Sequence, residues 1–411
     1  MFSPLRRWAG LLAAGGVAAL GYAVARREPT PVPTAGKVAE VEVARALEAP
    51  LQRGGIPGEI EVLVDGLPQA ARVTYTLDPF LQGYMERQMR LFGPDHGAFV
   101  ALDAVTGRVL VLVSRSRKPS VVGNLALRSS FPVASLFKII TAAAVLDRDR
   151  ADSESEIAFN GSDHTLYRRN VEQTRLTRWT RRMSLREAFA RSVNTVFAKV
   201  GIFMLSPEDL AEYAGRFGFN RAISAGIPME EGTVSIDGDR WRMAELASGF
   251  NRVALMSPLQ GAVIAGTVSN DGVMMQPYLV DRLDSASGES LYDALPREAS
   301  RAVTPRAAAE LREMMRETVL RGTSRRSFRD LLVSRRARGW VFGGKTGSLS
   351  GEDPKGKCDW FVGFAHEPHG QGWTGRRVAV AALTVNEKNW RVKSSYLARL
   401  FFERMLIQTG E

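Results

Sequence analysis

Five short runs of strand-forming residues, placed near the two ends of the region after residue 72, constrain the fold of this chain most. Residues 97–102 and 108–113 are β-rich, and the turn residues 103–107 between them predict a hairpin. Three further runs lie near the C-terminus, at residues 339–342, 360–364 and 378–385. Residues 135–330 read mostly as helical. We therefore predict an α/β fold whose antiparallel sheet is built from both ends of the domain and flanked by helices, with an inserted, mostly α-helical subdomain.

The first 71 residues predict an N-terminal membrane segment and a short linker. Arg6 and Arg7 precede an apolar run over residues 8–25, which would extend roughly 27 Å as a helix, close to the thickness of a bilayer core. We expect residues 1–27 to be an uncleaved anchor that leaves the rest of the chain outside the cytoplasm. A cleaved signal segment is the alternative, because residues 23–25 read Ala-Val-Ala. Residues 28–71 read as a Pro-rich linker followed by little strands or loops, and residues 72–411 as the main domain.

Charge and metal-ligand residues exclude two classes of function. The net charge of +11 favours a polyanionic neighbour in principle, but the arginines are scattered and no zinc finger, RNP-like strand or basic heptad occurs, so we expect no nucleic-acid partner. Cys358 is the single cysteine, which rules out a cysteine-based metal site. His366 and His369 flank Pro368, so we expect a surface loop there rather than a helical metal site. The sequence predicts no metal and no cofactor.

The tetrapeptide Ser135-Leu136-Phe137-Lys138 is the first of three candidate catalytic motifs. An apolar helical stretch follows it, so Ser135 and Lys138 would lie one turn apart on one helix face. A serine hydroxyl needs a base to become a nucleophile, and a lysine whose pKa is lowered by burial or by a second cation can be that base. Lys345 is the candidate second cation. The alternative is an N-capping serine followed by a solvated lysine.

Two further motifs follow in order. Ser192-Val193-Asn194 interrupts a helical stretch, where Ser192 could relay a proton and Asn194 could hold the lysine, although ordinary helix capping would also explain both. Lys345-Thr346-Gly347-Ser348 follows two glycines on a strand-like run, where the cation and hydroxyls could hold a carboxylate; an exposed edge strand with a glycine bend is the alternative.

Taken together and in this order, the three motifs resemble those of the penicillin-binding protein family of serine transpeptidases. The resemblance extends over roughly residues 72–408, and it also rests on the segments Thr76-Leu77-Asp78-Pro79, Val105-Thr106-Gly107, Met256-Ser257-Pro258-Leu259-Gln260, Ser269-Asn270-Asp271-Gly272, Arg321-Gly322-Thr323 and Asp359-Trp360-Phe361-Val362-Gly363-Phe364. It implies the penicillin-recognising serine acyltransferase fold.

The resemblance also implies a peptidoglycan D,D-transpeptidase. Ser135 would attack a D-alanyl-D-alanine stem peptide, release D-alanine and pass the acyl group to an amine of a neighbouring stem peptide, and β-lactams would acylate the same serine. Lys138 would be the base, with Ser192 and Asn194 as proton relay and substrate clamp and Lys345 as a further catalytic residue. Penicillin binding, cell-wall synthesis and a role in cell shape follow from the same resemblance.

Substrate binding is assigned by the resemblance to Thr346, Gly347 and Ser348, which with Lys345 would hold the terminal carboxylate. The backbone N–H groups of Ser135 and Ser348 would form the oxyanion hole. The family more often has threonine where this chain has Ser348, but a hydroxyl is kept, so we expect activity to survive.

The same resemblance places the protein in the bacterial cytoplasmic membrane as a single-pass protein with a periplasmic catalytic domain. No glycosyltransferase module precedes that domain, so a separate glycan-polymerising protein is expected as a partner. Three alternatives stay open: a D,D-carboxypeptidase, a β-lactamase-like hydrolase, and a catalytically silent scaffold for cell-wall or division proteins. Glu230 and Glu231 could suggest a deacylating base, but their setting resembles a connecting segment of the transpeptidases.

Overall fold

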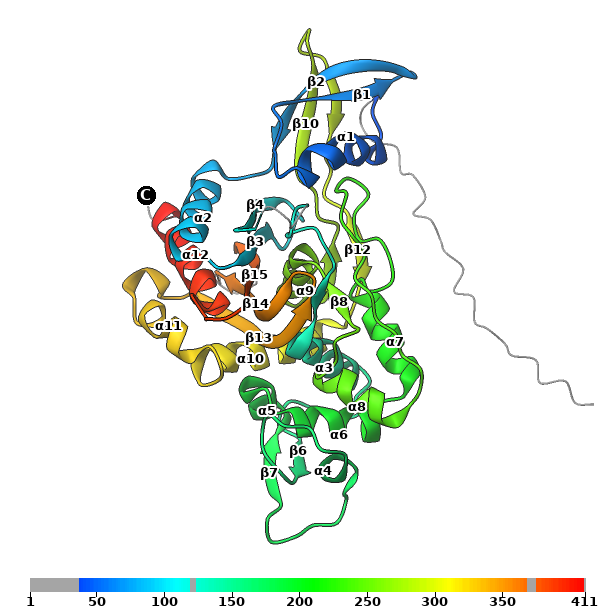
Figure 1. The fold of residues 1–411 in the computed structure, drawn as a ribbon, viewed down its shortest axis with the longest axis vertical. Coiled ribbons are helices and arrows are strands. Elements are labelled where there is room, and N and C mark those ends of the chain that lie inside the picture. Colours follow the sequence, from blue (N-terminus) through cyan, green and yellow to red (C-terminus); the bar gives the residue numbers. More distant parts are fainter. Residues whose placement is uncertain (1–36, 119–122, 368–374, 410–411) are drawn as a thin grey trace, which may run out of the picture. The chain divides into compact units, whose positions relative to one another are not determined.

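The computed structural model describes residues 37–118, 123–367 and 375–409. Its five-stranded sheet is antiparallel and has the order β13-β14-β15-β3-β4 (Figure 1). The strands are β3 (His96–Asp103), β4 (Val109–Ser116), β13 (Val341–Glu352), β14 (Lys355–His366) and β15 (Arg377–Asn386). Two strands from the start of the domain thus join three from its end, which confirms the predicted sheet.

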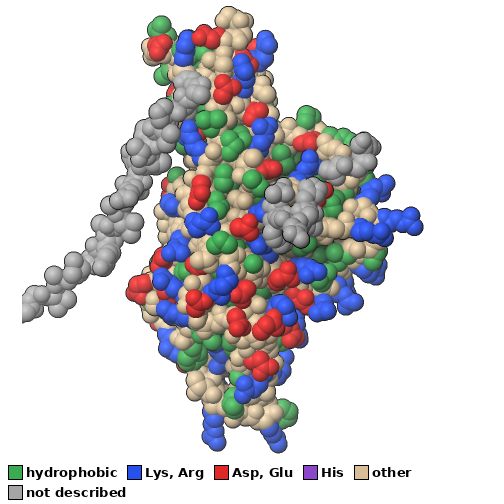
Figure 2. Space-filling view, turned by 180° about the vertical axis from the view of Figure 1, so that it is seen from behind, with side chains coloured by type: hydrophobic (Ala, Val, Ile, Leu, Met, Phe, Trp, Pro, Cys, Tyr) green, Lys and Arg blue, Asp and Glu red, His purple; other side chains and the backbone are tan. Residues whose placement is uncertain are grey.

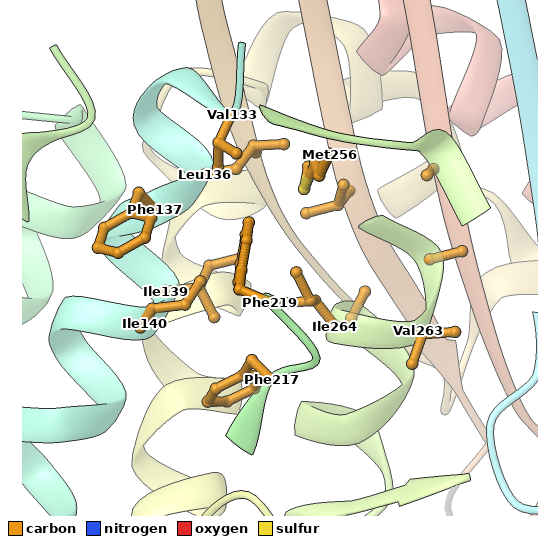
Figure 3. Packing of buried hydrophobic residues seen from close by; sticks show 14 of the residues in the cluster. Val133, Leu136, Phe137, Ile139, Ile140, Phe217, Phe219, Met256, Val263 and Ile264 are labelled. Atoms are coloured by element: carbon orange, nitrogen blue, oxygen red, sulfur yellow. The ribbon is translucent and has the colours of Figure 1, made fainter. Parts of the chain in front are cut away.

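The two faces of this sheet carry separate hydrophobic cores. Along β14, Trp360 and Val362 enter one core while Phe361 and Ala365 enter the other, because side chains on a strand alternate between its faces. The first core includes α3 (Phe137–Asp147) and α9 (Pro258–Ser269), and Figure 3 shows side chains of both helices within it. The second core is completed by α2 (Pro79–Phe92), α11 (Arg325–Leu332) and α12 (Ser394–Thr409). The sheet is therefore buried on both faces.

Helices are the main secondary structure of the chain between β4 and β13, in agreement with the prediction for residues 135–330. Besides α3, α9 and α11 it contains α4 (Arg168–Glu172), α5 (Leu185–Arg191), α6 (Asn194–Met204), α7 (Pro207–Arg216), α8 (Arg240–Ser248), α10 (Pro305–Leu320) and the 3-10 turns η1 (Ala134–Leu136) and η2 (Arg335–Ala337). Three two-stranded pairs lie among them, namely β5 (Phe131–Pro132) with β8 (Leu255–Met256), β6 (Glu156–Phe159) with β7 (Arg181–Ser184), and β9 (Val273–Met275) with β12 (Glu298–Arg301).

A second, four-stranded sheet joins segments that are far apart in the sequence. Its order is β1-β2-β10-β11, from β1 (Glu59–Val64), β2 (Leu67–Tyr75), β10 (Val280–Ser285) and β11 (Ser290–Asp293). Strand β2 runs across residue 72, where we placed the start of the main domain, and it pairs with β10. Residues 67–75 are therefore tied by backbone hydrogen bonds to the inserted region.

One helix occupies part of the segment where we expected little strands or loops. This helix, α1 (Glu40–Gln52), packs Val43, Leu47 and Leu51 inward, and these residues recur every four positions as an amphipathic helix requires. It contacts β1. The expectation was wrong because the Gly54-Gly55 and Pro57-Gly58 pairs, which favour loops, begin only after this helix has ended.

Two other expectations concern the chain ends. The predicted anchor and most of the linker lie outside the described residues; within the described ranges, no helix has both the length and the apolarity needed to cross a bilayer. His366, which we expected on a surface loop, is instead buried as the last residue of β14. It pairs with Val341 of β13 because the ladder between the two strands continues to that point.

Candidate active site

Ser135 lies in the 3-10 turn η1, directly before α3. From Phe131 to Leu146 it is the one residue that is not buried. The segment is held on both sides: the Val133 N–H donates to the Ala254 carbonyl at 2.9 Å, and the indole Nε1 of Trp360 donates to the Pro132 carbonyl at 3.0 Å. A single half-buried hydroxyl is thus presented by a segment that cannot shift without disturbing the core.

The backbone beside Ser135 adopts an unusual conformation. Ala134 has a φ of 53°, in the left-handed region that residues with a side chain seldom occupy. Gly249 packs directly against this turn, and a Cβ at position 249 would come within 2.0 Å of the Ala134 carbonyl oxygen. Such strain costs of order 1–3 kcal/mol and persists only where the surroundings impose it. Here the neighbouring glycine makes room for the turn.

Lys138 is fully buried, and its ammonium contacts three acceptors. Nζ donates to Ser135 Oγ at 2.9 Å, to Asn194 Oδ1 at 2.8 Å and to the Ser248 carbonyl at 2.5 Å. Burial, helped by the charge of nearby Lys345, holds the pKa of Lys138 well below its ordinary range. Because the lowered pKa favours the neutral amine, the Ser135 hydroxyl can donate to the Nζ lone pair across the same contact once the proton is lost.

Ser192 and Asn194 occupy the connection between α5 and α6. Ser192 ends α5 with a φ of 59°, and Asn194 begins α6. The Asn194 side chain is fixed in turn, because its Nδ2 donates to the His164 carbonyl at 2.7 Å and leaves Oδ1 for Lys138. The loop expected between two helices is present, and it turns both side chains toward the lysines.

Lys345 comes from the opposite wall of the site, on edge strand β13. Its Nζ donates to Ser192 Oγ at 2.8 Å and to the Thr346 carbonyl at 3.0 Å. Burial lowers the pKa of Lys345 from 10.5 to about 7. Ser192 is therefore hydrogen-bonded to Lys345, whereas Asn194 is hydrogen-bonded to Lys138. The three motifs, which are up to 213 positions apart (348 minus 135) in the sequence, meet at one place.

The residues after Lys345 line the same strand. Thr346 Oγ1 is 2.6 Å from Thr323 Oγ1, and the two hydroxyls share one hydrogen bond. Gly347 lies against the turn that carries Ser135, and a Cβ added at position 347 would be 3.2 Å from Leu136 Cγ. Ser348 is exposed. Strand β13 packs on η1 along this stretch, so all three residues border the Ser135 turn.

Sequence reasoning missed two contributors to this site. The Ser248 carbonyl, which accepts from Lys138, is a backbone atom, and only the following Gly249 at the end of α8 hinted at a special position. Thr323 stood in one of the segments that carried the family resemblance, but nothing in its local pattern showed that it would reach Thr346. Glu230 has a structural role, since its carboxylate accepts from the Ser129 N–H at 2.7 Å.

The arrangement has the parts needed for nucleophilic catalysis by a serine. Ser135 provides an accessible hydroxyl, and Lys138 provides a base of lowered pKa at hydrogen-bond distance. Lys345 adds a second cation, and the hydroxyls of Ser192, Thr346 and Ser348 add polar groups that can hold an anionic substrate. Lys138 is hydrogen-bonded to the Ser135 hydroxyl, which makes this lysine the candidate base.

Comparison with known proteins agrees with this geometry. A family model, the penicillin binding protein transpeptidase domain, matches residues 97–401. The peptidoglycan D,D-transpeptidase PbpA of Mycobacterium tuberculosis is 31% identical over 285 residues, which cover 60% of this chain and 56% of that protein. Stage V sporulation protein D of Bacillus subtilis is 25% identical over 293 residues, which cover 66% of this chain and 43% of that protein. The chain thus spans about half the length of the curated relatives it matches.

Solved structures share the fold. Penicillin-binding protein A of M. tuberculosis, described as an imipenem acyl-enzyme complex, has a TM-score of 0.66 at 26% identity, over 82% of this chain and 80% of that one. A D,D-transpeptidase domain from Eggerthella lenta has a TM-score of 0.67 at 22% identity, over 87% and 97% of the two chains, and is evidence for the fold alone.

Proposed function

We infer, from the premise that this chain belongs to the penicillin-binding protein transpeptidase family, that it is a peptidoglycan D,D-transpeptidase working through an acyl-enzyme on Ser135. One observation carries the proposal. The buried Lys138, whose pKa is lowered, has its Nζ 2.9 Å from the Oγ of Ser135, and Ser135 is the one residue from Phe131 to Leu146 that is not buried. A solvated lysine after a capping serine would have neither the burial nor the second lysine beside it.

The first step forms the acyl-enzyme. Neutral Lys138 takes the proton of Ser135 as Oγ attacks the carbonyl between the two D-alanines of a stem peptide. The resulting oxyanion is stabilised by backbone N–H groups, for which those of Ser135 and Ser348 are the candidates. When the tetrahedral intermediate collapses, the C–N bond breaks. The leaving amine gains the proton that Lys138 had taken from Ser135, and D-alanine departs.

The second step transfers the acyl group. An amine of a neighbouring stem peptide attacks the Ser135 ester and gives up a proton, the C–Oγ bond breaks, and Oγ regains a proton. Lys138 serves as base and acid in turn. Asn194 positions it, because its amide oxygen accepts from Nζ while its own N–H donates to the His164 carbonyl. We assign Ser192, whose hydroxyl accepts from Lys345 at 2.8 Å, to the proton transfer at the leaving amine.

The terminal carboxylate of the substrate is proposed to bind along β13. Lys345 supplies charge, while Thr346 and Ser348 supply hydroxyls, and Gly347 lets the substrate backbone approach the strand. A carboxylate at Lys345 would raise the pKa of that lysine from about 7, so the bound state holds it as a cation. As a cation, Lys345 then attracts the substrate carboxylate and also disfavours a positive charge on Lys138.

The location and partners are proposed from the same family membership. Residues 1–27 would anchor the chain in the bacterial cytoplasmic membrane, with the catalytic domain on the periplasmic side, where peptidoglycan stem peptides and β-lactams are found. Because transpeptidation needs glycan strands, a separate glycan-polymerising protein is the proposed partner.

Labelling with a fluorescent penicillin tests the nucleophile. We expect wild-type protein to be labelled covalently and Ser135→Ala to be unlabelled, while both unfold at the same temperature. Ser287→Ala is the matched control, because Ser287 is an exposed serine on the β10–β11 connection of the second sheet, and it should be labelled like wild type. Undiminished labelling of Ser135→Ala would refute the assignment.

Product analysis separates the transpeptidase from a carboxypeptidase. Purified protein is given a stem pentapeptide with and without an acceptor amine, and released D-alanine and cross-linked dimer are both measured. The proposal expects dimer whenever the acceptor is present. D-alanine release with no dimer, at any acceptor concentration, would instead identify a hydrolase of the same fold, and no D-alanine under any condition would favour a silent scaffold.

A further inference from the structure

A small pocket lies in the inserted region, outside the catalytic site. It has a volume of about 210 Å³ and is lined by β6, the connection from Gln173 to Thr180, and the end of α6. In Figure 1 these elements lie at the lower end of the fold, and Figure 2 shows Lys and Arg side chains projecting at that end. None of its lining residues belongs to the three catalytic motifs.

A buried lysine, Lys199 of α6, forms part of the pocket wall. Its side chain is 7% exposed. Nζ donates to the Gln173 carbonyl at 2.5 Å and lies 5.2 Å from the centre of the Phe203 ring, and both of these residues also line the pocket. Its ammonium therefore lies at the pocket wall rather than pointing into the protein core.

Lys199 lacks an anionic partner in the described part of the chain. No carboxylate forms an ion pair with it there, and its pKa is lowered by burial with no acidic neighbour to oppose the effect. A lysine ammonium has three N–H donors, of which Lys199 has one assigned to an acceptor. Because buried charges are normally paired, two donors at the wall of a pocket point to an anion that binds there.

The other buried lysines show what such a setting means in this molecule. Within the described ranges three lysines are buried, namely Lys138, Lys199 and Lys345. Lys138 and Lys345 also lack carboxylate partners in that part of the chain, and each is hydrogen-bonded to a serine of the candidate active site. Lys199 has the same character but lines a pocket away from that site.

The rest of the pocket wall defines the chemistry of the ligand. Apolar side chains make up much of it, from Ile157, Leu176, Phe203 and Met204, and Arg175 adds a second, exposed cation at the rim. Lys199 is the buried cation of this wall, and a single negative charge on a hydrocarbon body matches it together with the apolar side chains beside it, while polar residues such as Asn160 and Thr180 complete the lining. We propose that this pocket binds a small organic monocarboxylate, with the carboxylate at Lys199 and the apolar body against Phe203 and Ile157.

Binding can be tested in the full chain by methyl NMR. Pentanoate is the probe, and the labelled methyl groups of Ile157 and Met204 report occupancy of this pocket rather than of the catalytic site. We expect saturable shifts of both methyls with pentanoate and about ten-fold weaker binding of pentanamide, which has the same shape without the charge. Equal affinities for acid and amide, or no saturable shift, would overturn the proposal.

Two variants test the role of the cation. Lys199→Met removes the charge and keeps most of the volume, and it should weaken pentanoate binding about ten-fold or more while leaving pentanamide unaffected. Arg175→Gln, at the exposed rim, should weaken it about two-fold to three-fold. If Lys199→Met fails to fold, the comparison of acid and amide on the wild type decides alone. Binding of inorganic phosphate in place of pentanoate would also contradict the assignment.

Discussion

The two larger sheets of this protein differ in how they are buried and in what they carry. In the five-stranded sheet every residue of β15 is buried, and both faces are covered by helices. In the four-stranded sheet, β2 has a single buried residue, Ala71, in a strand that is otherwise exposed or half-buried. The three motifs lie on or against the first sheet and none touches the second. The site is therefore built on the more deeply buried of the two sheets, which suits a constellation that must keep 2.8–2.9 Å contacts.

The largest expected effect comes from the first region, at Lys138. Lys138→Met removes the base while keeping the side-chain volume, so acylation by penicillin should slow about 10³-fold, within the range that general bases contribute. The measurement is the second-order rate of acylation followed by stopped-flow fluorescence.

Lys355→Met is the control for that change. Lys355 is an exposed lysine on the hairpin between β13 and β14, so its replacement should leave the acylation rate unaltered. If Lys138→Met kept a rate within a few-fold of wild type, the base would have to be another group.

A smaller effect is expected from Lys345→Met, on the pH dependence of acylation. Acylation requires neutral Lys138, and Lys345 helps burial to lower the pKa of Lys138. Without Lys345 that pKa rises, so the rising limb of the rate against pH should move to higher pH and the rate at neutral pH should fall. An unchanged profile and an unchanged rate with penicillin would contradict this coupling.

The same variant should change how stability depends on pH. The pKa of Lys345 is about 7 in the folded protein, against 10.5 for an ordinary lysine, so between these values the unfolded chain binds more protons than the folded one. This difference makes the wild type more stable as pH rises from 7, by about 2 kcal/mol at pH 9. Lys345→Met should lack this increase when the free energy of unfolding is measured with urea at pH 7 and at pH 9. The same slope in both proteins would show that Lys345 is not buried as a neutral amine.

The smallest effect on acylation is expected from a pair of substitutions, one made in each sheet, which sharpens the comparison of the sheets directly. Val362→Ala in β14 should destabilise the protein by about 2–3 kcal/mol and slow acylation, because Val362 pairs with Lys345. Val62→Ala in β1 should cost about 1–2 kcal/mol and leave acylation unaltered. Both residues are fully buried valines, so the pair is matched. A slower acylation in Val62→Ala would mean that the second sheet influences the site.

The first sheet could be predicted from the sequence and the second could not, for a physical reason. Strands β3, β4, β14 and β15 have continuous apolar runs because both of their faces are buried, and such runs are visible locally. Strand β10 reads Val-Asp-Arg-Leu-Asp-Ser and pairs with β2 across more than 200 positions, so neither its composition nor its neighbours reveal the partner.

The site divides in the same way. Ser135 and Lys138 are one turn apart in the chain, so local geometry predicts their contact. The contact between Ser192 and Lys345 depends on the tertiary fold, and it was expected only through the order of three motifs. The Ser248 carbonyl has no signal of residue type at all, since every residue has a carbonyl.

Gly249 limits how this protein can evolve under selection by an inhibitor. A target often escapes by acquiring a bulkier side chain beside its reactive group, which crowds the drug more than the substrate. At position 249 that route is closed, because any Cβ would lie 2.0 Å from the Ala134 carbonyl oxygen and would displace the turn that carries Ser135. Resistance through this position would therefore disrupt the turn that presents Ser135 along with any inhibitor contact.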